Sequence, residues 1–207
     1  YLENKMTTIK YAITGGIASG KTTTLSLFKF LGFQTFNSDK AVKILMNQES
    51  IQQKILTKYP KIKSDSKGLD RQELSNLAFK DPKVLQFLEN IFHPKLDKIR
   101  KKQIQEANRN YRKGICFEIP LLFEKKLEKE FDIIILTFCS KKTQYERALL
   151  RKRIDRTKLS RILNSQSSDT YRKKRADFKI NTGIGKNHTM SEIKTILNRT
   201  IYKQCVK

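Results

Sequence analysis

The stretch Gly15-Gly16-Ile17-Ala18-Ser19-Gly20-Lys21-Thr22 has the spacing GxxxxGK[ST] of a phosphate-binding loop. In this motif the glycines let successive backbone N–H groups face the β-phosphate of a nucleotide. The lysine reaches the β and γ oxygens, and the final hydroxyl can bind Mg²⁺. The motif therefore predicts a nucleotide site, and a chance match in a glycine-containing turn is the alternative. We call residues 15–22 the phosphate loop.

The segments on either side of the phosphate loop favour the nucleotide site. Residues 9–14 read Ile-Lys-Tyr-Ala-Ile-Thr, a short apolar-rich run typical of a buried strand. A helical pattern begins at Lys21, and its apolar stripe contains Leu25, Phe28 and Leu31. A strand, a glycine-rich loop and a helix in this order place the helix N-terminus against the phosphates.

Four further segments are typical of strands: 33–36, 115–119, 132–139 and the weaker 179–181. Helical patterns between them predict βαβ units and a parallel sheet. The interval 45–111 contains no comparable apolar run and is too long for one crossover, so we expect a helical insertion there. Helix starts are predicted at Asp70 with Glu73 and at Asp81-Pro82, and Pro94 is expected to restart the chain. A smaller basic insertion is expected at 150–174.

Composition narrows the class of protein. The 207 residues fit one domain with a sizeable core, and no run of about 18 apolar residues predicts a membrane span. Residues 1–5 are polar, and we expect a cloning remnant or an upstream extension there. Three cysteines without metal-ligand spacing suit a cytoplasmic protein. The net charge of +24 is spread along the whole chain, so a lysine-rich composition is its simplest explanation and specific nucleic-acid binding is not expected.

Polar side chains follow the first three predicted strands. The phosphate loop follows the first strand, Asn37-Ser38-Asp39 follows the second, and residues 120–124 follow the third. Carboxyl ends of parallel strands lie at one edge of a sheet, where ligands bind. Asp39 could accept a proton from an attacking hydroxyl or help to position Mg²⁺. It could equally cap a helix that begins near Lys40, and the two roles are compatible.

From about residue 10 to residue 197 the chain resembles the dephospho-coenzyme A kinase family. The phosphate loop is shared by many NTPases, whereas the His-Pro and Pro-Leu-Leu-Phe-Glu elements make the resemblance specific. The matching elements are Ile13 to Thr22, Asn37-Ser38-Asp39, Asp70 to Leu74, Ala78-Phe79, Asp81-Pro82, His93-Pro94, Pro120 to Glu124, Gln144, Arg147, Gln166, Ala176-Asp177 and Asn181-Thr182-Gly183.

The resemblance implies an α/β, three-layer P-loop kinase fold with a mostly parallel five-stranded sheet. Residues 6–44, 112–149 and 175–207 would form the nucleotide-binding core, 45–111 the acceptor-binding insertion and 150–174 the lid. The implied reaction moves the γ-phosphate of ATP to the ribose 3′-hydroxyl of dephospho-CoA, with Mg²⁺ as cofactor, in the last step of coenzyme A synthesis. We expect a monomer or a weak homo-oligomer.

The same resemblance implies roles for individual residues. The catalytic residues are Asp39 as base, Lys21 and Arg147. The ATP contacts are Gly16, Ala18, Ser19, Gly20, Lys21, Thr22 and Thr23, with Thr22 also a Mg²⁺ ligand. The acceptor contacts are Thr14, Asp39, Arg71, His93, Leu121 and Glu124.

Several of these residues also have ordinary structural interpretations. His93 could be a turn or N-cap residue before Pro94, Arg71 an exposed residue at a helix start, and Glu124 a solvated loop residue. Arg147 and Arg151 lie four apart and could both reach phosphates, or belong to a solvated basic face.

Two positions depart from the family pattern. Asn37 replaces an aspartate. Ala18 replaces a glycine, which predicts that residue 18 does not need a positive φ.

Two rival functions remain. One is another small-molecule P-loop kinase that acts on a nucleoside, a nucleotide or shikimate. The other is a P-loop ATPase or switch protein that binds nucleic acid. Against the second, the sequence contains no Asn-Lys-x-Asp motif for guanine, and its third strand is followed by Pro120 without a clear Walker-B aspartate.

Overall fold

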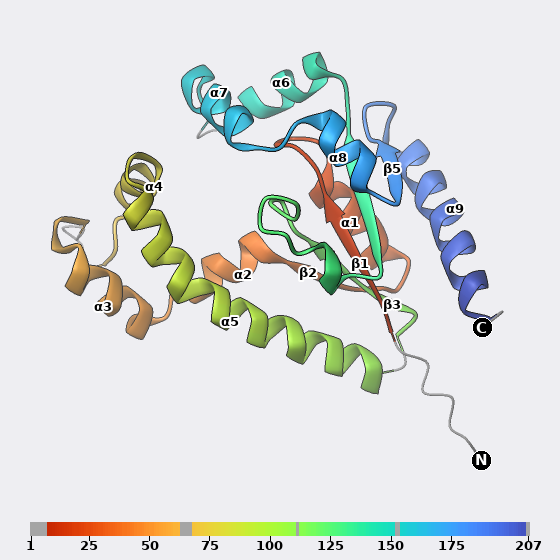
Figure 1. Cartoon of the computed structure of the whole chain (residues 1–207), viewed down its shortest axis with the longest axis horizontal. Coiled ribbons are helices and arrows are strands. Elements are labelled where there is room, and N and C mark those ends of the chain that lie inside the picture. Colours follow the sequence, from red (N-terminus) through yellow and green to blue (C-terminus); the bar gives the residue numbers. More distant parts are fainter. Residues whose placement is uncertain (1–7, 63–67, 111, 152–153, 206–207) are drawn as a thin grey trace. The chain divides into compact units, whose positions relative to one another are not determined.

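A computed structural model of the chain describes residues 8–62, 68–110, 112–151 and 154–205, with the backbone alone for 201–205 (Figure 1). The predicted extension at residues 1–5 lies outside these ranges. Strands and helices follow one another along the chain, and the strands form one sheet.

The sheet has five strands in the order β2-β3-β1-β4-β5, and all four neighbouring pairs are parallel. The predicted α/β class and five-stranded parallel sheet are therefore confirmed. Each predicted strand is present, with ends that differ by about one residue from the prediction. The strands are β1 (Ile9–Thr14), β2 (Gln34–Asn37), β3 (Gly114–Glu118), β4 (Ile133–Phe138) and β5 (Phe178–Asn181).

Helices occupy the intervals between the strands. In the described part of the chain, none of them combines the length and the apolar character that crossing a membrane requires. The α-helices are α1 (Lys21–Phe30), α2 (Ser38–Leu45), α3 (Glu49–Lys58), α4 (Arg71–Lys80), α5 (Pro82–Arg109), α6 (Lys141–Leu149), α7 (Arg156–Ser165), α8 (Asp169–Arg175) and α9 (Lys186–Cys205). Short 3₁₀ helices are η1 (Pro60–Ile62) and η2 (Glu128–Glu130).

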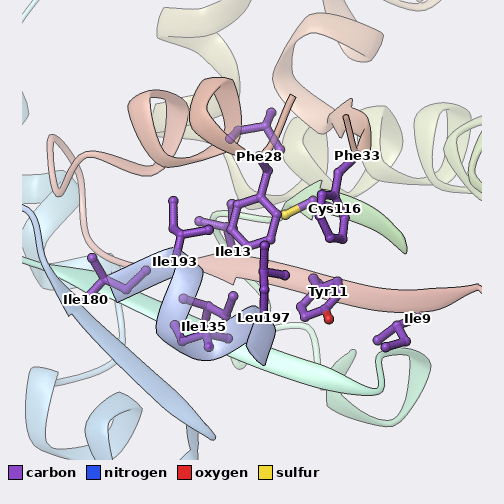
Figure 2. Packing of buried hydrophobic residues seen from close by; sticks show 12 residues of the cluster. Ile9, Tyr11, Ile13, Phe28, Phe33, Cys116, Ile135, Ile180, Ile193 and Leu197 are labelled. Atoms are coloured by element: carbon purple, nitrogen blue, oxygen red, sulfur yellow. The ribbon is translucent and has the colours of Figure 1, made fainter. Parts of the chain in front are cut away.

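The main hydrophobic core lies where α1 and α9 pack against the sheet (Figure 2). Strand β1 contributes alternate residues to it because side chains of a strand point to opposite faces in turn. Tyr11, Phe28 and Phe33 form an aromatic cluster with ring centroids 5.3–5.7 Å apart. The predicted apolar stripe of α1 is confirmed, since Leu25 and Phe28 are buried here and Leu31 packs beside them.

The chain divides into two compact units, residues 1–37 with 106–207 and residues 38–105. The second unit has its own core, built from α2, α3, η1, α4 and the first part of α5. Asp70 caps α4 as predicted, because its carboxylate accepts hydrogen bonds from the N–H groups of Gln72 and Glu73. Asp81 likewise accepts from the N–H of Lys83 at the start of α5.

Pro94 does not restart the chain, so this prediction was wrong. Helix α5 runs for 28 residues through Pro94. A proline inside a helix removes one hydrogen bond and costs about 3 kcal/mol. The helix continues because Phe92, Leu96 and Ile99, on both sides of the proline, pack into the same hydrophobic core. Burial of several large side chains in that core offsets the local cost.

Candidate phosphate-binding site

The phosphate loop begins at the carboxyl edge of the sheet, directly after β1. Strands β2 and β3 end at this edge with Asn37 and Glu118, which are opposite each other in the register. Glu118 also lies opposite Ile13 of β1. The site therefore starts from three adjacent strand ends, which is where parallel α/β sheets bind ligands.

Ala18 adopts the left-handed conformation with φ 57°, so the prediction that residue 18 needs no positive φ was wrong. This conformation costs an alanine about 1–2 kcal/mol. The structure compensates by burying residue 18, which is 5% exposed, in a cluster with Ile17, Ala148 and Leu159. The phosphate loop is thus packed against α6 and α7.

Side chains from other elements hold the backbone of the phosphate loop. Gln144 of α6 donates from Nε2 to the carbonyl of Ile17 at 2.8 Å, and the Oε1 atom of Gln166 accepts from the N–H of Ile17 at 3.1 Å. Thr182, just after β5, donates from Oγ1 to the carbonyl of Ser19 at 2.9 Å. These bonds fix the middle of the loop, at Ile17 and Ser19, to α6, to the segment before α8 and to the end of β5.

Lys21 lies over the start of the loop. Its ammonium donates to the carbonyls of Gly15 at 3.0 Å and Gly16 at 2.8 Å. Thr22 and Thr23 follow in the exposed first turn of α1, whose backbone N–H groups have no partner within the helix. A lysine charge and a helix N-terminus converge here, and both attract an anion.

Glu118 is a site residue that the sequence analysis missed. It is buried at the end of β3, where Oε1 accepts from the Thr22 hydroxyl at 3.0 Å and Oε2 accepts from Nδ2 of Asn37 at 2.5 Å. The strand has no aspartate at its end, as the sequence analysis noted, but Glu118 places an acid beside the threonine of the loop. The available signal was a charge inside an otherwise apolar strand, since such a charge is buried only with partners.

Thr14 and Arg147 lie near the loop in different ways. Thr14 ends β1 and is fully buried, and its Oγ1 has no hydrogen-bond partner among the described residues. Arg147 of α6 donates from Nη1 to Oγ1 of Thr182 at 3.2 Å and from Nη2 to the carbonyl of Thr182 at 3.0 Å. In this structure Arg147 thus braces the residue that holds Ser19.

The turn after β3 carries two predicted acceptor contacts. Leu121 is exposed there, next to the buried Leu122. Glu124 is half-buried, and its Oε1 accepts from the N–H of Ser167 at 2.7 Å. Glu124 therefore links this turn to the segment between α7 and α8, and its interpretation as a merely solvated loop residue was wrong.

The remaining predicted residues belong to the second unit. Asp39 is exposed in the first turn of α2, which begins at Ser38, so it lies inside the helix instead of capping one that starts at Lys40. Arg71 begins α4 and donates to Oδ1 of Asn47. His93 is exposed in the interior of α5, which rules out the turn and N-cap interpretations.

A parallel sheet with a phosphate loop after its central strand, a lysine over that loop and an acid beside its threonine defines a P-loop nucleotide-binding protein. The sequence profile of dephospho-CoA kinases matches residues 9–186. A dephospho-CoA kinase of Bartonella henselae is 35% identical over 181 residues, which cover 87% of this chain and 92% of that protein. The chain belongs to the dephospho-CoA kinase family.

Solved structures agree with this fold. A protein from Thermus thermophilus superimposes with a TM-score of 0.78 at 26% identity, over 93% of this chain and 98% of that one. The dephospho-CoA kinase from Campylobacter jejuni superimposes with a TM-score of 0.61 at 24% identity, over 93% of this chain and 97% of that one. The second likeness is evidence for the fold alone.

Gly20 and Gly32 provide a matched test of the packing behind the loop. They have nearly the same φ, 88° and 86°, but a Cβ on Gly20 would lie 2.7–2.8 Å from Thr182. A Cβ on Gly32 would have no described atom within 4 Å. We predict that Gly32→Ala costs about 1 kcal/mol of unfolding free energy from backbone strain alone. Gly20→Ala should cost clearly more and weaken ATP binding about tenfold or more.

Denaturant unfolding and calorimetric titration with ATP measure both effects. Equal losses in the two variants would contradict the idea that contact with Thr182 fixes the loop.

Proposed function

We propose that the chain transfers the γ-phosphate of ATP to the ribose 3′-hydroxyl of dephospho-CoA, which completes coenzyme A. The observation that carries this proposal is the family match over residues 9–186. The geometry of the phosphate loop supports it, because Lys21 and the N-terminus of α1 form a site for the phosphates of a nucleotide.

A protein catalyses phosphoryl transfer mainly by positioning the reactants and by neutralising negative charge. In our proposal the amides of Ala18 to Thr22 and the Lys21 ammonium hold the β- and γ-phosphates. Because Gln144, Gln166 and Thr182 already fix the loop, these donors need little rearrangement when charge develops on the transferred group. The proposed ATP contacts are the residues predicted from the sequence, Gly16, Ala18, Ser19, Gly20, Lys21, Thr22 and Thr23.

The acceptor side of the proposal rests on the second unit and on the turn after β3. We assign Asp39 as the base that takes the proton of the 3′-hydroxyl, since it is an exposed carboxylate two residues beyond the end of β2. Insertion 45–111 would bind the acceptor and 150–174 would act as a lid. The proposed acceptor contacts are Thr14, Arg71, His93, Leu121 and Glu124, and Arg147 would reach the phosphates only after releasing Thr182.

The residues around Thr22 fit a Mg²⁺ ion. The Thr22 hydroxyl donates a hydrogen bond to Glu118, so its lone pairs are available to a cation. Mg²⁺ prefers oxygen ligands and usually keeps water and phosphate in its shell, which suits a site with few protein ligands. The described residues contain no cluster of three acidic, His or Cys side chains that would form a protein cage. The ion would neutralise phosphate charge, and Thr22 with Glu118 behind it would hold it.

Three further expectations stay predictions: a cytoplasmic location, a monomer or weak homo-oligomer, and no specific binding of nucleic acid.

An acceptor panel tests the proposed activity. ADP release should depend on dephospho-CoA, with little release on adding shikimate, nucleosides or nucleotides. The product should carry its new phosphate on the ribose 3′-oxygen, which phosphorus NMR can establish. Faster ADP release with another acceptor would assign the chain to a different small-molecule kinase.

Asp39→Asn tests the base. The amide keeps the size of the side chain but cannot accept the proton, so kcat should fall about 10²- to 10⁴-fold. The melting temperature should not change, and the Kd for ATP should stay within about twofold of that of the unmodified protein, because Asp39 is exposed. Near-normal turnover would remove Asp39 from this role.

Glu118→Gln tests the acid behind Thr22. The amide can still accept from Thr22, and Asn37 can turn its oxygen toward the new NH₂ group, so the hydrogen bonds survive while the charge is lost. Loss of a residue that orients a metal ligand weakens metal binding about 10- to 100-fold. The Mg²⁺ concentration needed for half-maximal ATP affinity should rise by that factor, with ATP binding in EDTA unchanged. An unaltered Mg²⁺ requirement would show that Glu118 is purely structural.

A further inference from the structure

Helix α8 carries four consecutive basic residues, and only the first is buried. Residues 173–175 are exposed, whereas Arg172 is 4% exposed. The exposed charges need no special explanation, since they reach solvent and Arg175 also pairs with Glu128. A buried guanidinium does need one, because taking the charge out of water is costly without partners.

The hydrogen-bond partners of Arg172 are incomplete. Nη2 donates to Oδ1 of Asp169 at 2.7 Å. Nε and Nη1 are buried and have no partner among the residues that the structure describes. A buried donor without a partner costs about 1–3 kcal/mol, and more for a charged group. The side chain is therefore arranged as though a further acceptor belongs beside it.

The guanidinium lies next to the phosphate loop. A Cβ placed on Gly16 would be 3.4 Å from Nη2 of Arg172 and 2.5 Å from Nε2 of Gln144. The ammonium of Lys21 contacts the same residue through the Gly16 carbonyl at 2.8 Å. Two cationic groups from distant parts of the sequence thus meet at one glycine, which has no side chain to keep them from a ligand.

Among the described residues, Asp169 is the acidic side chain that pairs with Arg172. Asp169 binds Arg172, and it also pairs with Lys141 at 2.8 Å. Burial by itself would raise the pKa of Asp169, but hydrogen bonds and charge from Lys141 and Arg172 outweigh it and lower the pKa. One carboxylate is therefore shared between two cations, the buried Arg172 and the exposed Lys141.

From this geometry we infer that Arg172 binds a phosphate oxygen of the nucleotide in the phosphate loop, as a second cation beside Lys21. The ligand class is a nucleoside di- or triphosphate, whose oxygens supply the acceptors that Nε and Nη1 lack. Charged hydrogen bonds to phosphate are the strong ones in proteins, and arginine suits them. The inference rests on the nucleotide half of the proposed function and is independent of the acceptor.

The test compares Arg172→Gln with Lys174→Gln, which removes the same charge from an exposed position of the same helix. Calorimetric titrations use ATP, tripolyphosphate and adenosine, without any acceptor. Arg172→Gln should weaken ATP and tripolyphosphate about 10- to 100-fold and leave adenosine unchanged. Lys174→Gln should change none of the three by more than about twofold. Unchanged ATP binding, or an equal loss for adenosine, overturns the inference.

A second variant, Asp169→Asn, distinguishes phosphate binding by Arg172 from a purely structural role of Arg172 in holding α8. It also provides a test if Arg172→Gln does not fold. It removes the competing carboxylate but keeps the guanidinium. ATP should then bind at least as tightly as to the unmodified protein, even if the melting temperature falls. If Arg172 only braces α8 through Asp169, this variant should lose ATP affinity. Because no acceptor is present, absence of dephospho-CoA phosphorylation would leave these results unaffected.

Discussion

A phosphate-binding loop must be rigid while its N–H groups point at an anion, and this constraint governs the rest of the structure. Such a loop cannot be stabilised by a ladder of its own backbone hydrogen bonds. Here side chains do that work: Gln144 and Gln166 bind the peptide groups of Ile17, and Thr182 binds the carbonyl of Ser19. The anchoring residues lie 127 to 163 positions further along the sequence than the loop residues they bind, in α6, after β5 and in the segment before α8, so the folded sheet is a precondition for the site. A preorganised loop of this kind lowers the cost of placing charge in it.

Because of the strand order, residues on one side of β1 hold the loop backbone, and residues on the other side bind the Thr22 hydroxyl. On one side, β4 and β5 lead to α6 and Thr182, which hold the loop through neutral hydrogen bonds. On the other side, β3 ends in Glu118 and β2 ends in Asn37. The Glu118 carboxylate accepts a hydrogen bond from the Thr22 hydroxyl and a second one from the Asn37 amide, which holds it in place. The departure of Asn37 from the family pattern has a local reason here, since a neutral donor stabilises the Glu118 carboxylate 2.5 Å away.

The fold could be predicted from the sequence because its signals are local: the spacing of residues 15–22 and the apolar runs of the strands. The errors arose where burial overrides a local rule. Ala18 adopts a positive φ because its methyl group is buried, and Pro94 stays within a helix because apolar residues on both sides of it share one core. Glu118 was overlooked inside an apolar strand, and nothing local distinguishes Arg172 from the three basic residues after it. The role of Asp39 depends on an acceptor and stays a proposal.

A crystal structure with a non-hydrolysable ATP analogue, Mg²⁺ and dephospho-CoA would show whether the loop is preorganised and whether Asp39 faces the acceptor. We expect the loop to keep its present backbone, with Ala18 still at positive φ and Gln144 and Gln166 still bound to Ile17. We also expect the 3′-hydroxyl of the acceptor to lie within about 3 Å of the Asp39 carboxylate and to face the γ-phosphate. A loop that refolds around the phosphates, or a 3′-hydroxyl directed away from Asp39, would contradict these expectations.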